Sequence, residues 1–289
     1  MPAFSPPQIA RVFPDGLALD IMHIERHGDT AIHRHDFSEL VIVLRGSGVH
    51  RSPAGDYPIG AGDVFVLHGN QAHGYCNTAD LELVNILFCM DELAIPLQDV
   101  TVLPGYHVLF TLEPMFRQRD NFASRLRLTP DELQSVTELV YRLLKESRGR
   151  MPGWRFAAVA AFMLLVTELC RLYSHMDDQA AQPLLRLGRV IGYLEQHYSD
   201  PLTLEDLANV GCMSPRTLTR EFRQAMGSAP IAYLIRLRIN RAVNLLRNGQ
   251  ANITDVAFRV GFQDSNYFAR QFRAIVGRSP RDFRANNGK

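Results

Sequence analysis

The chain has 289 residues, of which 46% are hydrophobic and 21% are charged, and its formal net charge is +1. That length is sufficient for two domains with separate cores. Its four cysteines have no C-x-x-C or zinc-finger spacing, which argues against a disulfide framework and a structural zinc site and fits a reducing cytosol.

The first ten residues lack the basic segment and long apolar core of a signal peptide. The most apolar run, 156–166, is shorter than the ~20 residues that a membrane span needs. We therefore expect a cytoplasmic protein without a membrane partner.

The region from about 9 to 110 contains short apolar runs, such as 40–44, 64–67 and 83–88, separated by turn clusters. Many short strands with regular turns predict a sandwich or barrel. A helix is then expected from Thr129, an N-cap followed by Pro130 and by Glu132 at the capping-box position.

A second helix is expected over 154–175, and the two helices look like a hairpin that covers the barrel or pairs two subunits. The polar stretch 174–182 is the expected domain boundary. The predicted domains are a sensing barrel over 1–115, a helical dimerisation or linker region over 116–180, and a DNA-binding domain over 183–289.

The C-terminal domain repeats one unit. The segments 218–233 and 268–283 share a pattern of apolar, arginine, aromatic, glycine and proline positions fifty residues apart, and each follows a shorter helical segment. The pattern predicts two helix-turn-helix units joined by a helix over 231–248. Residues 183–289 carry 16 basic and 8 acidic residues, against 15 and 22 in the remainder, so this domain is expected to meet a polyanion.

The second helix of each unit separates an apolar face from a polar one. The residues expected to face the core are Leu218, Phe222, Ala225, Phe268, Phe272 and Ile275. The residues expected to contact DNA are Arg216, Thr219, Arg220, Arg223, Asp264, Ser265, Asn266, Arg270 and Arg273. Arginine suits guanine and asparagine suits adenine in the major groove, whereas Arg223 and Arg273, two turns along, suit phosphates.

At these residues the chain resembles the DNA-binding domain of AraC/XylS-type bacterial transcriptional regulators. The resemblance is strongest in the second unit, VAFRVGFQDSNYFARQFR followed by GRSPRDFR. The first unit has Cys212 where that family often has glycine, and the turn of the second unit is one residue longer when counted from Ala208 and Ala257. The resemblance implies promoter DNA as a partner.

Histidines and one carboxylate gather in the N-terminal part. His33 and His35 alternate on an expected strand and so project to one face, and Glu39 and His73 can join them. Three imidazoles and a carboxylate would suit Fe, Mn, Zn or Ni. The spacing from His33 to Gly46 resembles cupin motif one, and the second motif has His68 and Asn70 in place of the usual Pro and Gly.

The histidine cluster therefore has two open roles, a divalent metal site or the polar lining of an effector pocket. AraC-type sensors are themselves cupin-like and many use the barrel for an effector. The segments 33–50, 62–68 and 72–75 resemble the sensors of the L-rhamnose-operon activators. That resemblance implies a monosaccharide effector. The residues expected to contact it are His33, His35, Glu39, His73 and Tyr75.

The predicted fold is α+β: an N-terminal cupin-like β-barrel (jelly roll) with a helical hairpin, and a C-terminal all-α domain with two helix-turn-helix units. We expect a transcription regulator without enzymatic activity or a required cofactor, which binds promoter DNA as a homodimer, contacts RNA polymerase and responds to a small molecule such as L-rhamnose. The alternatives are a metal-dependent cupin enzyme and a regulator that answers to a protein partner without an effector.

Overall fold

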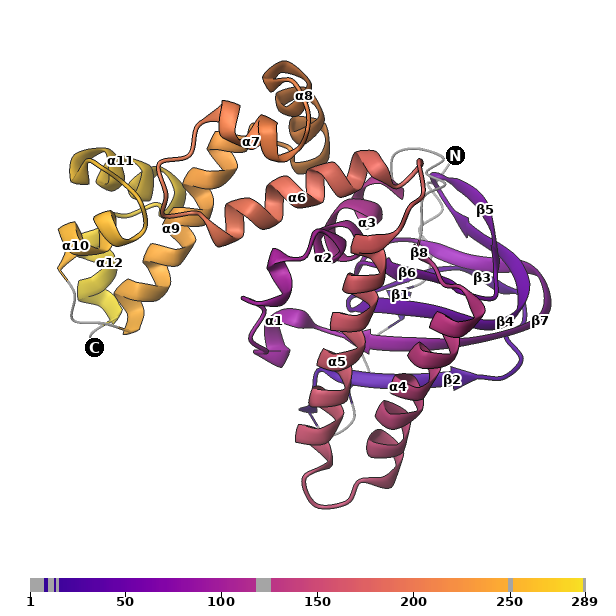
Figure 1. Ribbon diagram of the computed structural model, residues 1–289. Helices are drawn as coiled ribbons and strands as arrows, with labels where there is room; N and C mark the ends of the chain where they lie inside the picture. Colours follow the sequence, from indigo (N-terminus) through magenta and orange to yellow (C-terminus); the bar gives the residue numbers. More distant parts are fainter. Residues whose placement is uncertain (1–7, 10–12, 14–15, 118–125, 249–251, 288–289) are drawn as a thin grey trace, which may run out of the picture. The chain divides into compact units, whose positions relative to one another are not determined.

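The computed structural model describes residues 8–9, 13, 16–117, 126–248 and 252–287. It divides into two compact units, Met1–Gly188 and Arg189–Lys289, and the first is rich in strands whereas the second is helical (Figure 1). The cupin-like and helical fold classes are as predicted, and the finer division into 1–115, 116–180 and 183–289 stays a prediction.

The first unit is built on an eight-stranded sheet with the order β1-β3-β7-β4-β6-β8, in which β2 pairs with β7 and β5 with β4. The strands are β1 Gln8–Ile9, β2 Leu19–Ile24, β3 Thr30–His35, β4 Ser38–Ser52, β5 Gly55–Gly60, β6 Asp63–Leu67, β7 His73–Phe88 and β8 Leu126–Arg127. The predicted apolar runs lie in β4, β6 and β7, which are longer than the runs themselves because the two long strands continue through polar residues.

Both faces of the central strands are buried. The antiparallel register pairs Val41 with Asn85 and Glu39 with Leu87, so these side chains share one face. That interior face also holds the apolar cluster around Phe65. The opposite face turns toward the helices, where the rings of Phe88 and Phe162 lie 5.4 Å apart.

Helices complete the first unit. They are α1 Met90–Leu93, the 3-10 helix η2 Val100–Val102, α2 Pro104–His107, the π-helix η3 Val108–Leu112, α3 Glu113–Arg117, α4 Pro130–Gly149 and α5 Trp154–His175. Thr129 and Glu132 form the expected capping box at the start of α4. The helices α4 and α5 form a hairpin, and α4 contacts β2 (Figure 1).

The apolar character of α5 extends beyond the predicted run 156–166. Among the described helices it is the one that is long and apolar enough, by length and composition, to cross a membrane. Its Phe162, Leu165 and Leu169 are fully buried in the first unit, as expected of a core helix. The helix has the predicted bounds 154–175, and its apolar character extends past the run 156–166 because apolar residues continue around Glu168 and Arg171.

The second unit consists of short helices around a long one. Its helices are α6 Gln182–Gln196, which begins in the first unit, α7 Leu204–Val210, α8 Pro215–Met226, α9 Pro230–Asn248, α10 Ile253–Arg259, α11 Ser265–Val276 and α12 Pro280–Asn287. Both α7 and α8 contact α9, and so do α10, α11 and α12. Ile239, Ala242 and Leu246 of α9 are core residues of the α10–α12 cluster.

Candidate functional site

The first DNA-reading candidate is α8, whose ends are fixed by its own sequence. The Ser214 hydroxyl accepts a hydrogen bond from the Thr217 backbone N–H at 3.1 Å and so caps the first turn. Gly227 ends the helix in the left-handed conformation, with φ at 69°. Leu218, Phe222 and Ala225 are buried as predicted, which leaves the opposite face to solvent.

The second candidate, α11, repeats this arrangement with one difference. The Asp264 carboxylate caps the helix by accepting from the Asn266 backbone N–H at 2.8 Å, and Phe268 and Phe272 are buried. The prediction that Ile275 faces inward is wrong, because its side chain is 39% exposed. At this last turn the core cluster packs against Val276 in its place.

The exposed faces carry the predicted DNA contacts. Those exposed to solvent are Arg216, Arg220, Arg223, Asp264, Asn266, Arg270 and Arg273, and those half-buried are Thr219 and Ser265. The Thr219 hydroxyl donates to the Pro215 carbonyl at 2.8 Å, so it already has a partner within its own helix. The Asp264 carboxylate caps α11, and its negative charge would be repelled by nearby DNA phosphates, so Asp264 is less suited to a DNA contact than the arginines.

Surface grooves run along both helices. One, of about 620 Å³, is lined by α8 residues that include Arg216, Arg220 and Arg223. The other, of about 480 Å³, is lined by Asp264 and Arg270 among others. Concave arginine-bearing surfaces along two helices suit phosphates and guanine edges.

The turns of the two helix-turn-helix motifs, α7–α8 and α10–α11, reach the same left-handed backbone conformation with different residues. Met213 N–H donates to the Ala208 carbonyl and Phe262 N–H to the Ala257 carbonyl, so Cys212 and Gly261 occupy equivalent positions. Both have positive φ, 50° for Cys212 and 91° for Gly261. A cysteine in the left-handed region is strained, whereas glycine adopts it freely. The extra residue expected in the second turn lies after Phe262.

The N-terminal candidate site lies on the interior face of the sheet. His35 Nε2 lies 3.1 Å from Glu39 Oε2, and His73 Nε2 lies 3.4 Å from the same oxygen. The His33 ring lies beside that of His73, with centroids 4.5 Å apart. Tyr75 is also buried, and its ring lies 6.3 Å from that of His73. The fold thus brings all five predicted effector residues together.

Electrostatics make Glu39 the anion of this cluster. Burial opposes its ionisation, but hydrogen bonds and charge interactions with His35 and His73 outweigh that cost and bring its pKa to about 2. Burial also lowers the pKa of His33, and hydrogen bonding to the Ala31 carbonyl only partly offsets it. The site therefore pairs a carboxylate with at least one imidazole that favours its neutral form.

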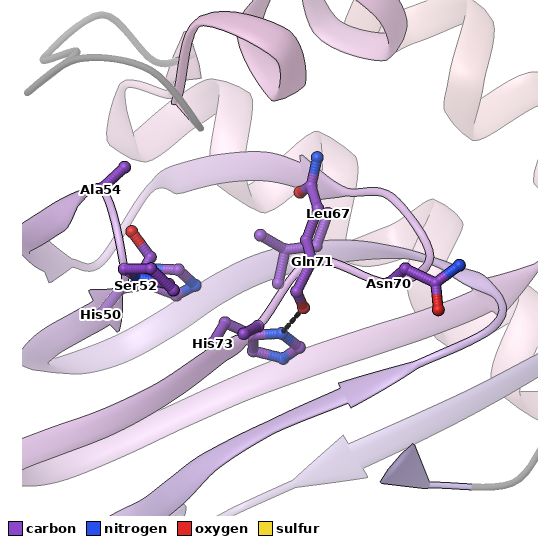
Figure 2. Close-up of a pocket in the computed structure, with 9 residues that line it drawn as sticks. His50, Ser52, Ala54, Leu67, Asn70, Gln71 and His73 are labelled. Atoms are coloured by element: carbon purple, nitrogen blue, oxygen red, sulfur yellow. Dashed lines mark hydrogen bonds between the residues drawn. The ribbon is translucent and has the colours of Figure 1, made fainter. Parts of the chain in front are cut away.

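A cavity of about 280 Å³ adjoins the cluster (Figure 2). Of the five predicted effector residues, His73 is the one that lines it, and its Nδ1 donates to the Gln71 carbonyl at 3.2 Å. His50 lines it too, with its ring stacked 5.7 Å from that of His73. The volume lies just below the ~300–1,000 Å³ typical of ligand pockets, which suits a small ligand.

Two polar residues of the barrel interior were missed in the sequence. His50 pairs in register with Tyr75, so it shares the interior face. Asn85 is 8% exposed, and its Oδ1 has no hydrogen-bond partner among the residues that the structure describes. The sequence feature that could have indicated Asn85 is an asparagine inside the apolar run 83–88, because a polar side chain in a buried strand normally needs a hydrogen-bond partner.

Comparison with protein families supports both halves of this description. The family model described as AraC-like ligand binding domain matches residues 19–151. The model described as helix-turn-helix domain matches residues 207–286. The barrel cluster and both DNA-reading helices lie within these ranges.

Similar proteins cover most of the chain. The HTH-type transcriptional activator RhaS of Klebsiella pneumoniae (strain 342) is 34% identical over 254 residues, 87% of this chain and 86% of that protein. The protein of the same name from Escherichia coli O1:K1 / APEC is 32% identical over the same shares.

Several solved structures match part of the chain. The DNA-binding domain of AdpA, solved in complex with a target DNA, is 35% identical over 35% of this chain and 91% of that chain, with a TM-score of 0.34. An AraC-type regulator from Chromobacterium violaceum is 29% identical over 39% and 98%, with a TM-score of 0.35. From the family models and the relatives, the chain belongs to the AraC family and is a DNA-binding transcriptional activator with a ligand-binding domain.

Proposed function

We propose that this activator responds to a small polyhydroxyl molecule, a monosaccharide, bound inside the N-terminal barrel. The observation that carries the proposal is the Asn85 Oδ1 atom, which lacks a partner in the described part of the chain and is buried on the face that also holds Glu39. A buried carbonyl without a partner costs free energy, and a ligand hydroxyl that donates to it recovers that cost. The barrel binds this effector without catalysing a reaction on it and needs no organic cofactor.

The chemistry of the interior favours a sugar over an apolar effector. His73 and His50 border the cavity, and Gln71 and Ser52 add polar groups to its lining. Sugars are recognised by several hydrogen-bonding groups around a small cavity. The resemblance to the L-rhamnose-operon activators makes L-rhamnose the first candidate.

The α4–α5 hairpin is the proposed dimer contact. Its exposed apolar side chains include Phe156, which is 84% exposed, Leu164 at 51% and Tyr141 at 50%. Large apolar side chains that gather on one hairpin are typical of an interaction surface. The F156D/L164D double variant should sediment as a monomer where the wild-type chain sediments as a dimer, and R142D should sediment like the wild type.

In this scheme the chain acts in the cytoplasm as a homodimer on promoter DNA and recruits RNA polymerase there. Arg216, Arg220 and Asn266 read bases, and Arg223 and Arg273 hold phosphates. The effector raises the population of domain arrangements in which both subunits engage adjacent half-sites. It can do so only through a higher affinity for that arrangement.

The decisive experiment is calorimetric titration of the full-length chain with a panel of monosaccharides, L-rhamnose first. N85L removes the unpartnered carbonyl at similar volume. We expect it to weaken sugar binding by about tenfold, the loss of one hydrogen bond, while stabilising the ligand-free protein by about 1–2 kcal/mol. The control N244L changes an exposed residue of α9 and should alter neither quantity. A folded chain that binds none of the sugars would remove the proposal and favour regulation by a protein partner.

A further inference from the structure

The three clustered histidines His33, His35 and His73 share one hydrogen-bond pattern that effector binding does not explain. The Nδ1 atoms of His33, His35 and His73 lie 3.0, 2.7 and 3.2 Å from the carbonyl oxygens of Ala31, Phe37 and Gln71. A carbonyl only accepts, so each Nδ1 carries the proton. In the neutral imidazole the Nε2 atom then bears a lone pair.

Two of these lone pairs point at one place. His35 Nε2 and His73 Nε2 both approach Glu39 Oε2, at 3.1 and 3.4 Å. One ligand atom from each of the three residues lies within 4.8 Å of the others, and all three side chains are buried. When both imidazoles are neutral, three electron-pair donors converge with no hydrogen between them, and such a cluster needs a cation at its centre.

We propose that His35, Glu39 and His73 bind one divalent transition-metal ion in the barrel of this regulator. Backbone carbonyls hold the Nδ1–H of both histidines, which is the outer interaction that fixes the ring orientation and tautomer of metal-ligating histidines. When both Nδ1 atoms carry the proton and both imidazoles are neutral, their Nε2 lone pairs are available for coordination, as metal binding requires.

The donor set also defines the class of ion. Two imidazole nitrogens and one carboxylate oxygen suit Fe(II), Mn(II), Co(II), Ni(II) or Zn(II), whereas Mg²⁺ and Ca²⁺ prefer oxygen ligands alone. His73 lines the 280 Å³ cavity, so the ion would border the space in which an effector is proposed to sit. The inference does not require that effector to be a sugar.

The competing occupant of the same space is a pair of protons. Both histidines would then be doubly protonated beside Glu39, with two imidazolium rings 5.1 Å apart in a buried site. Like charges at that separation repel each other, and burial adds the cost of desolvating both. One divalent ion gives the cluster the same net charge with both imidazoles neutral.

The test uses the full-length chain, purified with its affinity tag removed and stripped with a chelator. It is then dialysed against Mn²⁺, Co²⁺, Ni²⁺, Zn²⁺ or, without oxygen, Fe²⁺. We expect about one equivalent of at least one of these ions after gel filtration, measured by mass spectrometry of the metal. At free metal of about 100 times Kd the melting temperature of the first unit should rise by about 5–10 °C.

Variants locate the site. E39Q keeps the shape of the side chain and removes its charge, and H73Q removes one nitrogen; each should weaken metal binding by more than about 100-fold. The control H27Q changes a half-buried histidine outside the ligand set and should bind like the wild type. If the ligand variants do not fold, the visible spectrum of the Co²⁺-loaded wild-type chain still reports nitrogen and oxygen ligands.

Two results would overturn the proposal. One is binding of less than a tenth of an equivalent of every ion per chain, together with an unchanged melting temperature, which would mean that the histidines are protonated and bind no metal. The other is unaltered metal uptake by a folded E39Q chain, which would place the ion elsewhere. Neither result depends on a sugar, so the metal proposal and the effector proposal are tested independently, the latter by calorimetric titration with monosaccharides.

Discussion

Replacing Arg220 with alanine tests whether α8 reads bases. The Arg220 side chain is 70% exposed, and it forms an ion pair with the adjacent Glu221 across 3.2 Å. Exposed pairs of this kind contribute at most about 1 kcal/mol, so the R220A chain should fold with nearly unchanged stability. A change in DNA binding is then a change at the interface.

The magnitude follows from the kind of contact. A bidentate arginine–guanine pair gives about 1–3 kcal/mol of discrimination against the wrong base, which corresponds to about 5- to 150-fold in affinity. We expect R220A to lose that factor on a site selected from random DNA by the wild-type chain, and to become indifferent to one base pair in it. Fluorescence anisotropy at fixed salt, over the site and its single-base variants, measures both effects.

The control separates base reading from charge. R189A removes the same charge from an exposed position on α6, outside both helix-turn-helix units, and should leave base preference unchanged. If R220A weakened binding equally on the selected site and on random DNA, with a salt slope lower by ~0.9, the arginine would be a phosphate contact and α8 would not read that base.

Two further predictions concern stability. G261A places a Cβ 2.6 Å from the Ser199 carbonyl oxygen at a φ of 91° and should destabilise the second unit by about 3 kcal/mol. C212G relieves the left-handed strain at Cys212 and should stabilise the same unit by up to about 1 kcal/mol. Urea denaturation of both variants measures these free energies of unfolding. His107 is buried, and burial lowers its pKa to about 4 although its hydrogen bond to the Thr101 carbonyl raises it. Because the folded pKa lies below the unfolded value of ~6.5, stability present above pH 6.5 should fall by about 3 kcal/mol as the pH drops to 4, and H107Q should lose this dependence.

The C-terminal unit was the more predictable half because local signals set its elements. Ser214 and Asp264 cap α8 and α11 as their side chains indicate, and the buried phenylalanines follow the helical period. Ile275 shows the limit of that reasoning. Its spacing fits the inward face, but which residue of the last turn is covered depends on how α9 and α12 pack against the helix.

The barrel site was predictable only in part, because its geometry depends on long-range pairing. The spacing from His33 to Glu39 predicted the cluster, because alternation along one strand places His33 and His35 on the same face. The membership of Asn85 and His50 depends on the register of β4 with β7, and that register shifts at bulges between Val43 and Val49. A shift by one residue would turn these side chains to the opposite face.

The shared helix α9 constrains how an effector can act. It has 19 residues and so spans ~28 Å. Both DNA-reading helices pack against it, and Ile239 of α9 belongs to the same core cluster as Phe268 of α11. The separation of the two helices is thus fixed by their packing on α9, whose length is comparable with the ~34 Å between successive major grooves. An effector in the barrel cannot change that spacing without disrupting this core. We therefore expect the effector to change how often the barrel and the DNA-binding domain adopt a binding-competent arrangement. An effector-dependent change in the number of base pairs between the two DNA contacts of one subunit would contradict this expectation.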